Sequence, residues 1–317
     1  MDQALVVFVA VAEEQNFTRA AERLHISQPA VTQHIQNLER AWGVELFDRS
    51  RRKVHLNRAG EVVLSHAREI LSLYRSLDRQ LDELKQSVSG ALSIGASLTF
   101  GEYVLPHLIA RFRQEYPEVD ATVEIENTAA VVEKVRLGEV DIGVIEGSYR
   151  GDDVIVEPFA EDRVIVVAAD ELYRDLALPA SSEALSRLTW MIREQGSGTR
   201  EITDRVMQWY GLHPAKVVEY ASTQVIKESV EAGLGIAILS RWVVRREIAW
   251  GILREVPLQP PNGAFTHARP ADGEPARDVT SRRFSVVRRN SSFHPKVVHV
   301  FREFLFAVGH QLNQFEV

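Results

Sequence analysis

Apolar and polar positions along the first forty residues follow the spacing of three short helices, with apolar side chains recurring every three or four positions. Thr18 can cap the second helix, and Ser27 suits the N-cap of the third. Pro29 then falls in the first turn of the third helix, where its missing N–H costs nothing. The positions expected to face a core are Leu5, Phe8, Val9, Ala12, Ala20, Ala21, Leu24, Val31, Ile35 and Leu38.

The opposite face of the third predicted helix is rich in amides and hydroxyls. Its residues are Gln28, Pro29, Thr32, Gln33 and Gln36. Amides and hydroxyls can hydrogen bond to base edges in the major groove of DNA, and an exposed proline ring can contact a thymine methyl group. An apolar inner face and an amide-rich outer face are what a DNA-recognition helix requires. The alternative, a helix-turn-helix that contacts only protein, would leave this outer face unexplained.

A basic hairpin is predicted after the third helix. The segments Leu46-Phe47 and Val54-His55-Leu56 read as two short strands around a turn. Residues 49–58 contain no acid, and their basic side chains are Arg49, Arg51, Arg52, Lys53 and Arg58. Such a hairpin would lie as a wing against DNA phosphates, which position a protein without reading sequence.

Residues 61–89 are predicted to form one long helix, because no proline occurs between Pro29 and Pro106 and no glycine between Gly60 and Gly90. Two apolar stripes run along it. They comprise Leu64, Ala67, Leu71, Tyr74, Leu81, Leu84 and Val88, and Val63, Ile70 and Leu77. Two stripes need more than one partner surface, which favours the pairing of two chains. Packing of the helix on its own domain is the alternative.

From Ala91 onward, short apolar strands alternate with helical stretches such as Leu105–Tyr116, Arg200–Tyr210 and Val225–Ala232, the pattern of an α/β fold. The expected strands are Ala91–Gly95, Thr122–Ile125, Asp141–Ile145, Arg163–Ala168, Trp190–Ile192, Val217–Tyr220, Ile236–Leu239 and Phe284–Val287. Residues Pro257–Ser281 hold five of the twelve prolines and have no clear period, so a surface loop or insertion is expected there.

Composition narrows the class of protein. The chain has 317 residues, 45% hydrophobic and 26% charged, which suits a globular protein of at least two domains. The absence of cysteine excludes disulfides, thiolate catalysis and cysteine-based metal sites. The longest apolar run, Ala4–Ala12, is nine residues, too short to span a membrane. It follows Asp2 rather than a basic segment, so we expect a cytoplasmic protein without a signal peptide.

Taken alone, the net charge of −7 disfavours a nucleic-acid partner, but the charge is unevenly distributed. Residues 1–89 hold 12 basic and 12 acidic side chains, whereas the remaining residues hold 25 and 32. The acid excess therefore belongs to the later part of the chain, and the predicted wing concentrates positive charge in the first.

The first sixty residues also carry dense family motifs. These are the run from Phe17 to Ile35, Leu38-Glu39, Leu46-Phe47-Asp48-Arg49 and Arg58-Ala59-Gly60. They resemble LysR-type transcriptional regulators, whose layout the chain follows over most of its length. The resemblance implies an all-α winged helix-turn-helix head at 1–60, a linker and dimerisation helix at 61–89, and an α/β two-lobed effector domain like the type 2 periplasmic binding proteins. Lobe I would comprise 90–161 and 289–317, and lobe II 162–288, with a loop insertion at 257–281.

The resemblance also implies roles for residues in the head. The matching positions Gln28, Pro29, Thr32 and Gln33 read bases, while Thr18 and the wing hold the backbone. The expected DNA-binding set is Thr18, Ser27, Gln28, Pro29, Thr32, Gln33, Gln36, Arg49, Arg51, Arg52 and Lys53. Many members carry Ser-Arg where this chain has Thr32-Gln33, so its preferred half-site should differ from theirs.

Three strand-to-helix turns offer hydroxyls beside the N–H groups of a following helix: Ser93–Thr99, Arg193–Arg200 and Ala221–Gln224. Each arrangement suits an anion, although any single turn taken alone is better explained as a helix cap. The resemblance implies that the turns converge on an effector between the lobes. The residues expected to bind it are Ser97, Thr99, Gln195, Gly196, Ser197 and Thr223. The Gly-Ser-Gly-Thr-Arg form resembles members that control sulfur or other inorganic-nutrient assimilation, which suggests a small oxyanion or carboxylate.

Three other functions fit the sequence less well. An enzyme is disfavoured because nucleotide-binding, zinc-protease and hydrolase motifs are absent and the histidines form no pair at metal spacing. A transport binding protein would fit the two-lobed α/β domain alone, but it would not explain the helix-turn-helix at 1–60. A purely structural dimer would fail to bind promoter DNA in a gel shift. We therefore expect no catalytic residue, cofactor or metal. The expected partners are double-stranded promoter DNA, a small anionic effector, copies of the chain in a homodimer or homotetramer, and RNA polymerase, with no membrane.

Overall fold

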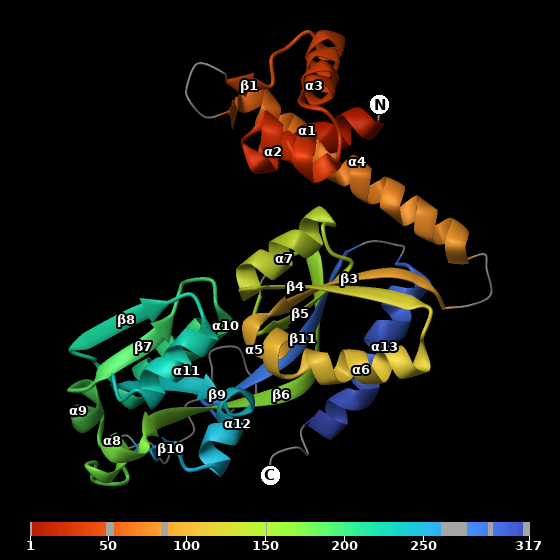
Figure 1. Cartoon of the computed structure of the whole chain (residues 1–317). Coiled ribbons are helices and arrows are strands. Elements are labelled where there is room, and N and C mark those ends of the chain that lie inside the picture. Colours follow the sequence, from red (N-terminus) through yellow and green to blue (C-terminus); the bar gives the residue numbers. More distant parts are fainter. Residues whose placement is uncertain are drawn as a thin grey trace. The chain divides into compact units, whose positions relative to one another are not determined.

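The structure is a computed structural model that describes residues 2–48, 54–83, 88–149, 151–260, 278–290 and 294–312. The chain divides into two compact units. Met1–Ser87 together with Leu137–Glu139 forms the first unit, and Val88–Arg136 together with Val140–Val317 forms the second. We call these units the head and the body, and each is described by itself (Figure 1).

The head contains three short helices, a two-stranded ribbon and a long helix (Figure 1). Their bounds are α1 (Asp2–Glu14), α2 (Phe17–Leu24), α3 (Gln28–Trp42), β1 (Phe47–Asp48), β2 (His55–Leu56) and α4 (Arg58–Glu83). The predicted N-cap of α3 is confirmed, since Ser27 Oγ accepts a hydrogen bond from the N–H of Ala30 at 3.3 Å. The head is thus a helix-turn-helix followed by a strand pair, as the sequence predicts.

The predicted cap of α2 is wrong. Asn16, not Thr18, caps this helix, because Asn16 Oδ1 accepts hydrogen bonds from the N–H groups of Thr18 and Arg19 at 2.8 and 3.1 Å. Asn16 has an extended backbone and lies directly before the first helical residue, Phe17, which is where an N-cap acceptor reaches the free N–H groups. Thr18 is already inside the helix.

The predicted apolar faces meet in one core. Val31, Ile35 and Leu38 of α3 are buried, as are Ala20 and Ala21 of α2. Val9, Ala12 and Leu24 are only partly buried against this core, whereas other residues, which the sequence pattern did not assign to this core, belong to it. These additional buried residues are Val7, Ala10, Val11, Leu46, Phe47 and Ala67.

The ribbon joins α4 through a close backbone approach. Phe47 pairs with Leu56 in the antiparallel ribbon, and Asn57 Oδ1 accepts from the N–H of Gly60 at 2.9 Å to cap α4. A Cβ at Gly60 would lie 2.2 Å from the carbonyl oxygen of Leu46, so only glycine fits there. The predicted strands are confirmed, but the wing residues Arg49, Arg51, Arg52 and Lys53 lie outside the described residues.

The long helix α4 divides its apolar side chains between two surroundings. Val63, Leu64, Ala67 and Leu71 pack on the core of the head. A second set remains exposed on α4 and includes side chains that the sequence stripes missed. This set is Val62, Ile70, Leu73, Tyr74 and Leu77, and the exposed fraction of Leu73 reaches 68%. The helix also begins at Arg58, three residues before the predicted start, and residues 84–87 lie outside the described residues.

The described part of the body is an α/β structure built on a nine-stranded sheet in the order β4-β3-β5-β11-β6-β9-β7-β8, with β10 paired to β6 (Figure 1). The strands are β3 (Gly90–Ser97), β4 (Val119–Glu126), β5 (Ile142–Glu146), β6 (Val154–Ala169), β7 (Thr189–Arg193), β8 (Lys216–Tyr220), β9 (Ile236–Ser240), β10 (Leu253–Glu255) and β11 (Ser281–Arg289). The helices are α5 (Leu98–Tyr103), α6 (Leu105–Glu115), α7 (Thr128–Leu137), α8 (Asp170–Arg174), α9 (Ser182–Ser186), α10 (Gly198–Tyr210), α11 (Thr223–Glu231), α12 (Arg241–Ala249) and α13 (Lys296–Leu312). The predicted α/β class is confirmed.

Two strands cross from one half of the sheet to the other. The first part of β6 pairs with β11, and residues Val164–Val167 pair with β9. The predicted strand Arg163–Ala168 is therefore only the end of β6, because the earlier residues Val154–Asp162 mix charged and apolar side chains and gave no strand pattern. The predicted returning strand is confirmed as part of β11, which pairs with both β5 and β6.

The predicted loop at Pro257–Ser281 is only partly correct. Its beginning is ordered against another segment, since the N–H of Ala180 donates to the carbonyl of Pro257 at 2.8 Å and Gln259 returns a bond to Ala180 at 2.9 Å. Ser281 is already the first residue of β11. Residues 261–277 lie outside the described residues.

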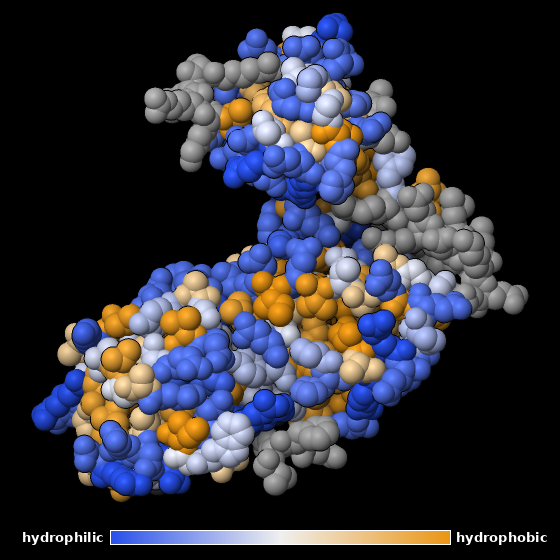
Figure 2. Space-filling view, viewed as in Figure 1, coloured by the Kyte–Doolittle hydropathy of each residue, from blue (hydrophilic) through white to orange (hydrophobic). Residues whose placement is uncertain are grey.

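The edge of the sheet at β4 presents apolar side chains to solvent. Val123 and Ile125 have exposed fractions of 39% and 41%. Figure 2 shows apolar surface over this edge, where β4 runs in Figure 1. The opposite edge strand, β8, exposes Val217 in the same way.

Candidate functional site

The outer face of α3 is exposed, as the sequence predicts. Gln28, Pro29, Gln33 and Gln36 are exposed and Thr32 is half-buried. Gln28 Nε2 donates to Thr32 Oγ1 at 2.9 Å, and Gln33 Nε2 donates to Asn37 Oδ1 at 2.8 Å. The face is therefore a surface of polar side chains with defined partners, presented by a helix whose other side is anchored in the core.

Two arginines of α2 are held by acidic side chains of α1. Arg23 Nη1 lies 2.7 Å from Glu13 Oε2, and Arg19 Nε lies 3.6 Å from Glu14 Oε2. Hydrogen bonding and charge attraction from Glu13 raise the pKa of Arg23. Thr18, in contrast, is exposed at the start of α2. The basic members of the predicted DNA-binding set, Arg49, Arg51, Arg52 and Lys53, lie outside the described residues.

In the body, a carboxylate already occupies the first predicted anion-binding turn. Ser97 Oγ donates to Glu146 Oε2, and the N–H of Glu146 donates back to Ser97 Oγ at 3.0 Å. The N–H of Thr99 donates to Glu146 Oε1 at 3.4 Å. Ser97, Thr99 and Glu146 are all buried. The N–H of Thr99 is therefore not free for an anion, because Glu146, the last residue of β5, supplies an internal acceptor.

The second turn lies against the segment between β4 and α7. Ser197 Oγ caps α10 by accepting from the N–H of Thr199 at 3.2 Å. The carbonyl of Gly196 accepts from the N–H of Ala129 at 3.1 Å. Gly198 packs so closely that a Cβ would lie 2.0 Å from the carbonyl oxygen of Glu146. Gln195 and Gly196 are exposed, unlike the buried Ser197.

Arg193 connects the second turn to the third. Its buried guanidinium donates from Nη1 to Thr223 Oγ1 at 2.8 Å, and from Nε and Nη2 to the carboxylate of Glu194 at 2.7 and 2.8 Å. Asn127 Nδ2 donates to the same carboxylate at 3.2 Å. Burial tends to raise the pKa of Glu194, but the bonds from Arg193, the backbone and Asn127 outweigh it and lower that pKa.

Arg282, on the crossing strand β11, links the first turn to the helix that follows the second. It donates to Thr99 Oγ1 at 3.1 Å and to Thr199 Oγ1 at 2.9 Å. Its Nε donates to Asp162 Oδ2 at 2.7 Å. Burial raises the pKa of Asp162, against the opposing attraction of Arg282 and the bond from Ser240. The cluster is a buried, internally satisfied polar network.

The structure thus brings Ser97, Thr99 and Ser197 into the hydrogen-bonded network of Arg282 and Glu146. Thr223 belongs to the neighbouring group around Arg193, and Gln195 and Gly196 are exposed. Sequence reasoning missed the charged members of both groups. These are Glu146, Asp162, Arg193 and Arg282. Glu146 and Arg193 had a usable signal, because each ends an apolar strand with a charged residue. Asp162 and Arg282 lie among other charged residues, so nothing in the sequence separates them from surface charges.

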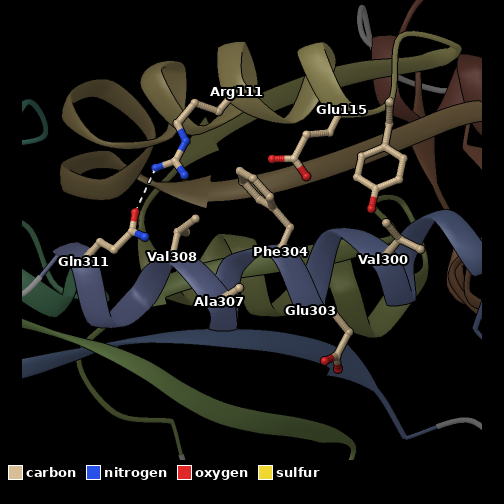
Figure 3. Close-up of a pocket in the computed structure, with 9 residues that line it drawn as sticks. Arg111, Glu115, Val300, Glu303, Phe304, Ala307, Val308 and Gln311 are labelled. Atoms are coloured by element: carbon tan, nitrogen blue, oxygen red, sulfur yellow. Dashed lines mark hydrogen bonds between the residues drawn. The ribbon is translucent and has the colours of Figure 1, made fainter.

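A groove of about 360 Å³ lies elsewhere on the body, between α6 and α13 (Figure 3). Phe304 and Val308 lie at its apolar base, and Arg111 reaches across it to donate to Gln311 Oε1 at 3.1 Å. None of the predicted effector residues lines this groove. It is therefore separate from the polar network of the three turns.

Among the described residues, no group of three or more histidine, aspartate or glutamate side chains is arranged to hold a metal ion. Within the same ranges, no helix has the length and apolarity needed to cross a membrane.

Comparison with known proteins identifies the family. The profile described as "LysR substrate binding domain" matches residues 85–309, and the one described as "Bacterial regulatory helix-turn-helix protein, lysR family" matches residues 3–61. The HTH-type transcriptional regulator CysL of Bacillus subtilis is 39% identical over 80% of this chain and 84% of its own length. The chain belongs to the LysR family: it is a DNA-binding transcriptional regulator with an effector-binding domain.

Solved structures agree with the fold. A full-length OxyR variant from Pseudomonas aeruginosa, 27% identical, superimposes with a TM-score of 0.68 over 96% of this chain and 94% of its own. Full-length CbnR complexed with its target DNA, 21% identical, gives a TM-score of 0.67 over 96% of this chain and 98% of its own. The latter likeness concerns the fold alone.

Proposed function

We propose that α3 is the recognition helix of this regulator and reads base edges through Gln28, Pro29, Thr32, Gln33 and Gln36. The observation that carries the proposal is the exposed amide face of α3, backed by the buried Val31, Ile35 and Leu38. Thr18, Ser27 and the wing residues Arg49, Arg51, Arg52 and Lys53 hold the DNA backbone. The solved CbnR complex, which shares the fold, supports a DNA-facing role for this type of head.

Footprinting and salt titration test the assignment. Arg51→Ala combined with Arg52→Ala should weaken binding to every duplex and flatten the salt dependence, because phosphate contacts carry no sequence information. Gln28→Ala or Gln33→Ala should instead change the preferred sequence. A dimer with about four phosphate contacts per subunit should show a log–log salt slope of roughly −7. Unchanged footprints in all of these variants would contradict the proposal.

The effector is proposed to bind between lobe I (90–161 and 289–317) and lobe II (162–288), through Ser97, Thr99, Gln195, Gly196, Ser197 and Thr223. The exposed Gln195 and Gly196, which lie next to the buried hydroxyl of Ser197 at the start of α10, support binding of a polar effector there. The Gly-Ser-Gly-Thr-Arg turn supports a small oxyanion or carboxylate of the kind used in sulfur or other inorganic-nutrient assimilation. The effector shifts the lobes only as far as it binds one arrangement more tightly than the other.

A calorimetric and thermal-shift panel tests this assignment with sulfate, thiosulfate, acetylserine, phosphate and small dicarboxylates. One class of anion should bind, and Thr223→Val should weaken that binding because it removes a hydroxyl beside Arg193. His299→Ala, at an exposed position on α13, serves as the control. No heat and no thermal shift with any member of the panel would remove the anionic effector.

We further propose a homodimer, paired through the exposed apolar side chains of α4, that assembles into a homotetramer on promoter DNA in the cytoplasm. Side chains of this size rarely stay exposed together on one helix unless they meet a partner. RNA polymerase is the further partner that regulation of transcription from such a promoter requires.

A further inference from the structure

The orientation of one amide on α3 is fixed by chemistry. Asn37 Oδ1 accepts from Gln33 Nε2 at 2.8 Å and also from Arg40 Nη1 at 3.3 Å. A guanidinium can only donate, so the atom of Asn37 that faces Arg40 must be its oxygen. The atom of Gln33 that shares this oxygen must then be its NH₂ group. The oxygen and nitrogen of the Gln33 amide are thereby assigned without ambiguity.

This arrangement determines what Gln33 can offer to DNA. One N–H of its amide is used within the helix, which leaves the carbonyl oxygen as an acceptor and the second N–H as a donor. Gln33, Asn37 and Arg40 are all exposed, and they are spaced three and four residues apart, so they lie together on one side of the helix. The side chain of Gln33 therefore presents an acceptor beside a donor.

Among the base pairs, adenine matches that pair of groups. Its major-groove edge presents the N6 amino donor beside the N7 acceptor. Guanine presents two acceptors, N7 and O6, so the Gln33 oxygen would face another acceptor. Cytosine presents only its N4 amino donor, which leaves the Gln33 N–H without a partner.

We propose that Asn37 and Arg40 are positioning residues that orient the Gln33 amide to read an adenine in the major groove of each half-site. The proposal rests on the assignment of α3 as the recognition helix and adds the base it reads and the residues that fix its specificity. Asn37 does not touch the base in this scheme. It restricts Gln33 to one amide orientation, so that the correct base finds the side chain already placed.

The test is a selection of duplexes from a randomised pool by the full-length protein, followed by affinity measurements with each of the four base pairs at every half-site position. Gln33→Ala identifies the position that Gln33 reads. There the wild-type protein should prefer adenine by about tenfold to a hundredfold, the discrimination expected of a bidentate contact. Gln33→Glu should move the preference toward cytosine, because a carboxylate only accepts.

The positioning role has its own readout. Asn37→Ala should reduce the adenine preference at that one position several-fold, with little change elsewhere in the site and an unchanged thermal unfolding midpoint. Asn37→Asp keeps an oxygen between Gln33 and Arg40, so it should restore the preference while its added charge weakens binding to all sequences equally. Arg40→Ala should lie between the wild type and Asn37→Ala.

The outcomes separate the two levels of the argument. If Gln33→Ala alters no base position, the assignment of α3 as the reading helix fails. If Gln33→Ala alters a position but Asn37→Ala leaves its preference intact, the positioning role is overturned while the recognition helix stands. A guanine or cytosine at the Gln33 position in wild-type sites overturns the adenine assignment.

Discussion

Arg282 and Asp162 form a buried ion pair in which the guanidinium Nε lies 2.7 Å from the carboxylate Oδ2 and both side chains are almost completely excluded from solvent. Thr99 and Thr199 accept further hydrogen bonds from Arg282, and Ser240 donates to Asp162 at 2.6 Å. Arg282 and Asp162 are partners in the antiparallel pairing of β11 with β6. The ion pair therefore links residues from either side of the proposed effector site.

Removal of one partner of this pair should be costly. Arg282→Met leaves a buried carboxylate without its cation and should lower the free energy of unfolding by about 3–5 kcal/mol. The double variant Arg282→Met with Asp162→Leu should recover a large part of that loss, because no unpaired charge remains buried. Urea unfolding of the two single variants and the double variant measures the coupling. Strict additivity would show that the two groups do not act as a pair.

The same pair predicts a pH dependence. Burial raises the pKa of Asp162, and Arg282 opposes that rise. In Arg282→Met the opposition is gone, so the pKa rises further. An acid whose pKa is higher in the folded than in the unfolded protein costs stability as the pH rises above its unfolded value. The variant should therefore lose less stability at mildly acidic than at mildly alkaline pH. An equal loss at both would show that the carboxylate does not take up a proton.

Glu157 predicts a pH dependence of stability with the opposite sign. Hydrogen bonds from Arg302 and Arg288 outweigh burial and lower its pKa from 4.5 to about 2. A carboxylate whose pKa is lowered by folding stabilises the protein at a pH above its pKa in the unfolded chain. That contribution disappears as the pH falls toward its pKa in the folded protein. Glu157→Gln should thus destabilise the protein by about 1 kcal/mol near neutral pH, a figure reduced for solvent screening. The difference from wild type should shrink below pH 4.5.

Glu303→Gln is the matched control for Glu157, because Glu303 also contacts Arg302 but its side chain is 56% exposed. Its substitution should change the unfolding free energy by only a few tenths of a kcal/mol at any pH. Equal effects of the two substitutions would mean that Glu157 gains nothing from its second arginine.

Gly60 gives a prediction for the head. In Gly60→Ala the new Cβ would meet the carbonyl oxygen of Leu46 at 2.2 Å, so the ribbon must move away from α4. We expect a loss of about 2–3 kcal/mol in the stability of the head and weaker binding to all duplexes. Gly43→Asn is the control, since Gly43 has a positive φ of 68° but open space around a Cβ, and asparagine tolerates that backbone conformation. Thermal unfolding, followed by a spectroscopic signal that reports on the head alone, compares the stability of Gly60→Ala and Gly43→Asn.

What the sequence could predict depended on how local the determining interaction was. The core face of α3 followed from the spacing of Val31, Ile35 and Leu38, since a helix fixes which of its own residues share a side. The cap of α2 was misassigned because Asn16 and Thr18 are both good capping residues and only the backbone of Asn16 decides between them. The family resemblance, not the local pattern, supplied the two-lobed arrangement.

The polar network of the body could not be predicted for a different reason. Glu146 meets Ser97 across 49 residues of sequence, and Arg282 meets Thr99 across 183. A sequence pattern shows which turns carry hydroxyls, but it does not show which carboxylate the fold will bring to them. Ser97 and Thr99 were correctly placed at a strand-to-helix turn, yet the N–H of Thr99 donates to Glu146 of β5 instead of facing an open site.

The exposed face of α4 leads to the last prediction. The exposed fractions of Leu73 and Leu77 are 68% and 48%, whereas Ala67 on the same helix is buried in the head. If two chains pair through this face, Leu73→Glu with Leu77→Glu should remove about 1.5–3 kcal/mol of apolar burial per side chain and place charges against each other. Sedimentation should then show a smaller particle. Binding to duplexes with two half-sites should also weaken. Ser65→Glu, at an exposed polar position of α4, should leave both unchanged, and an unaltered mass in the leucine variant would show that the chains pair elsewhere.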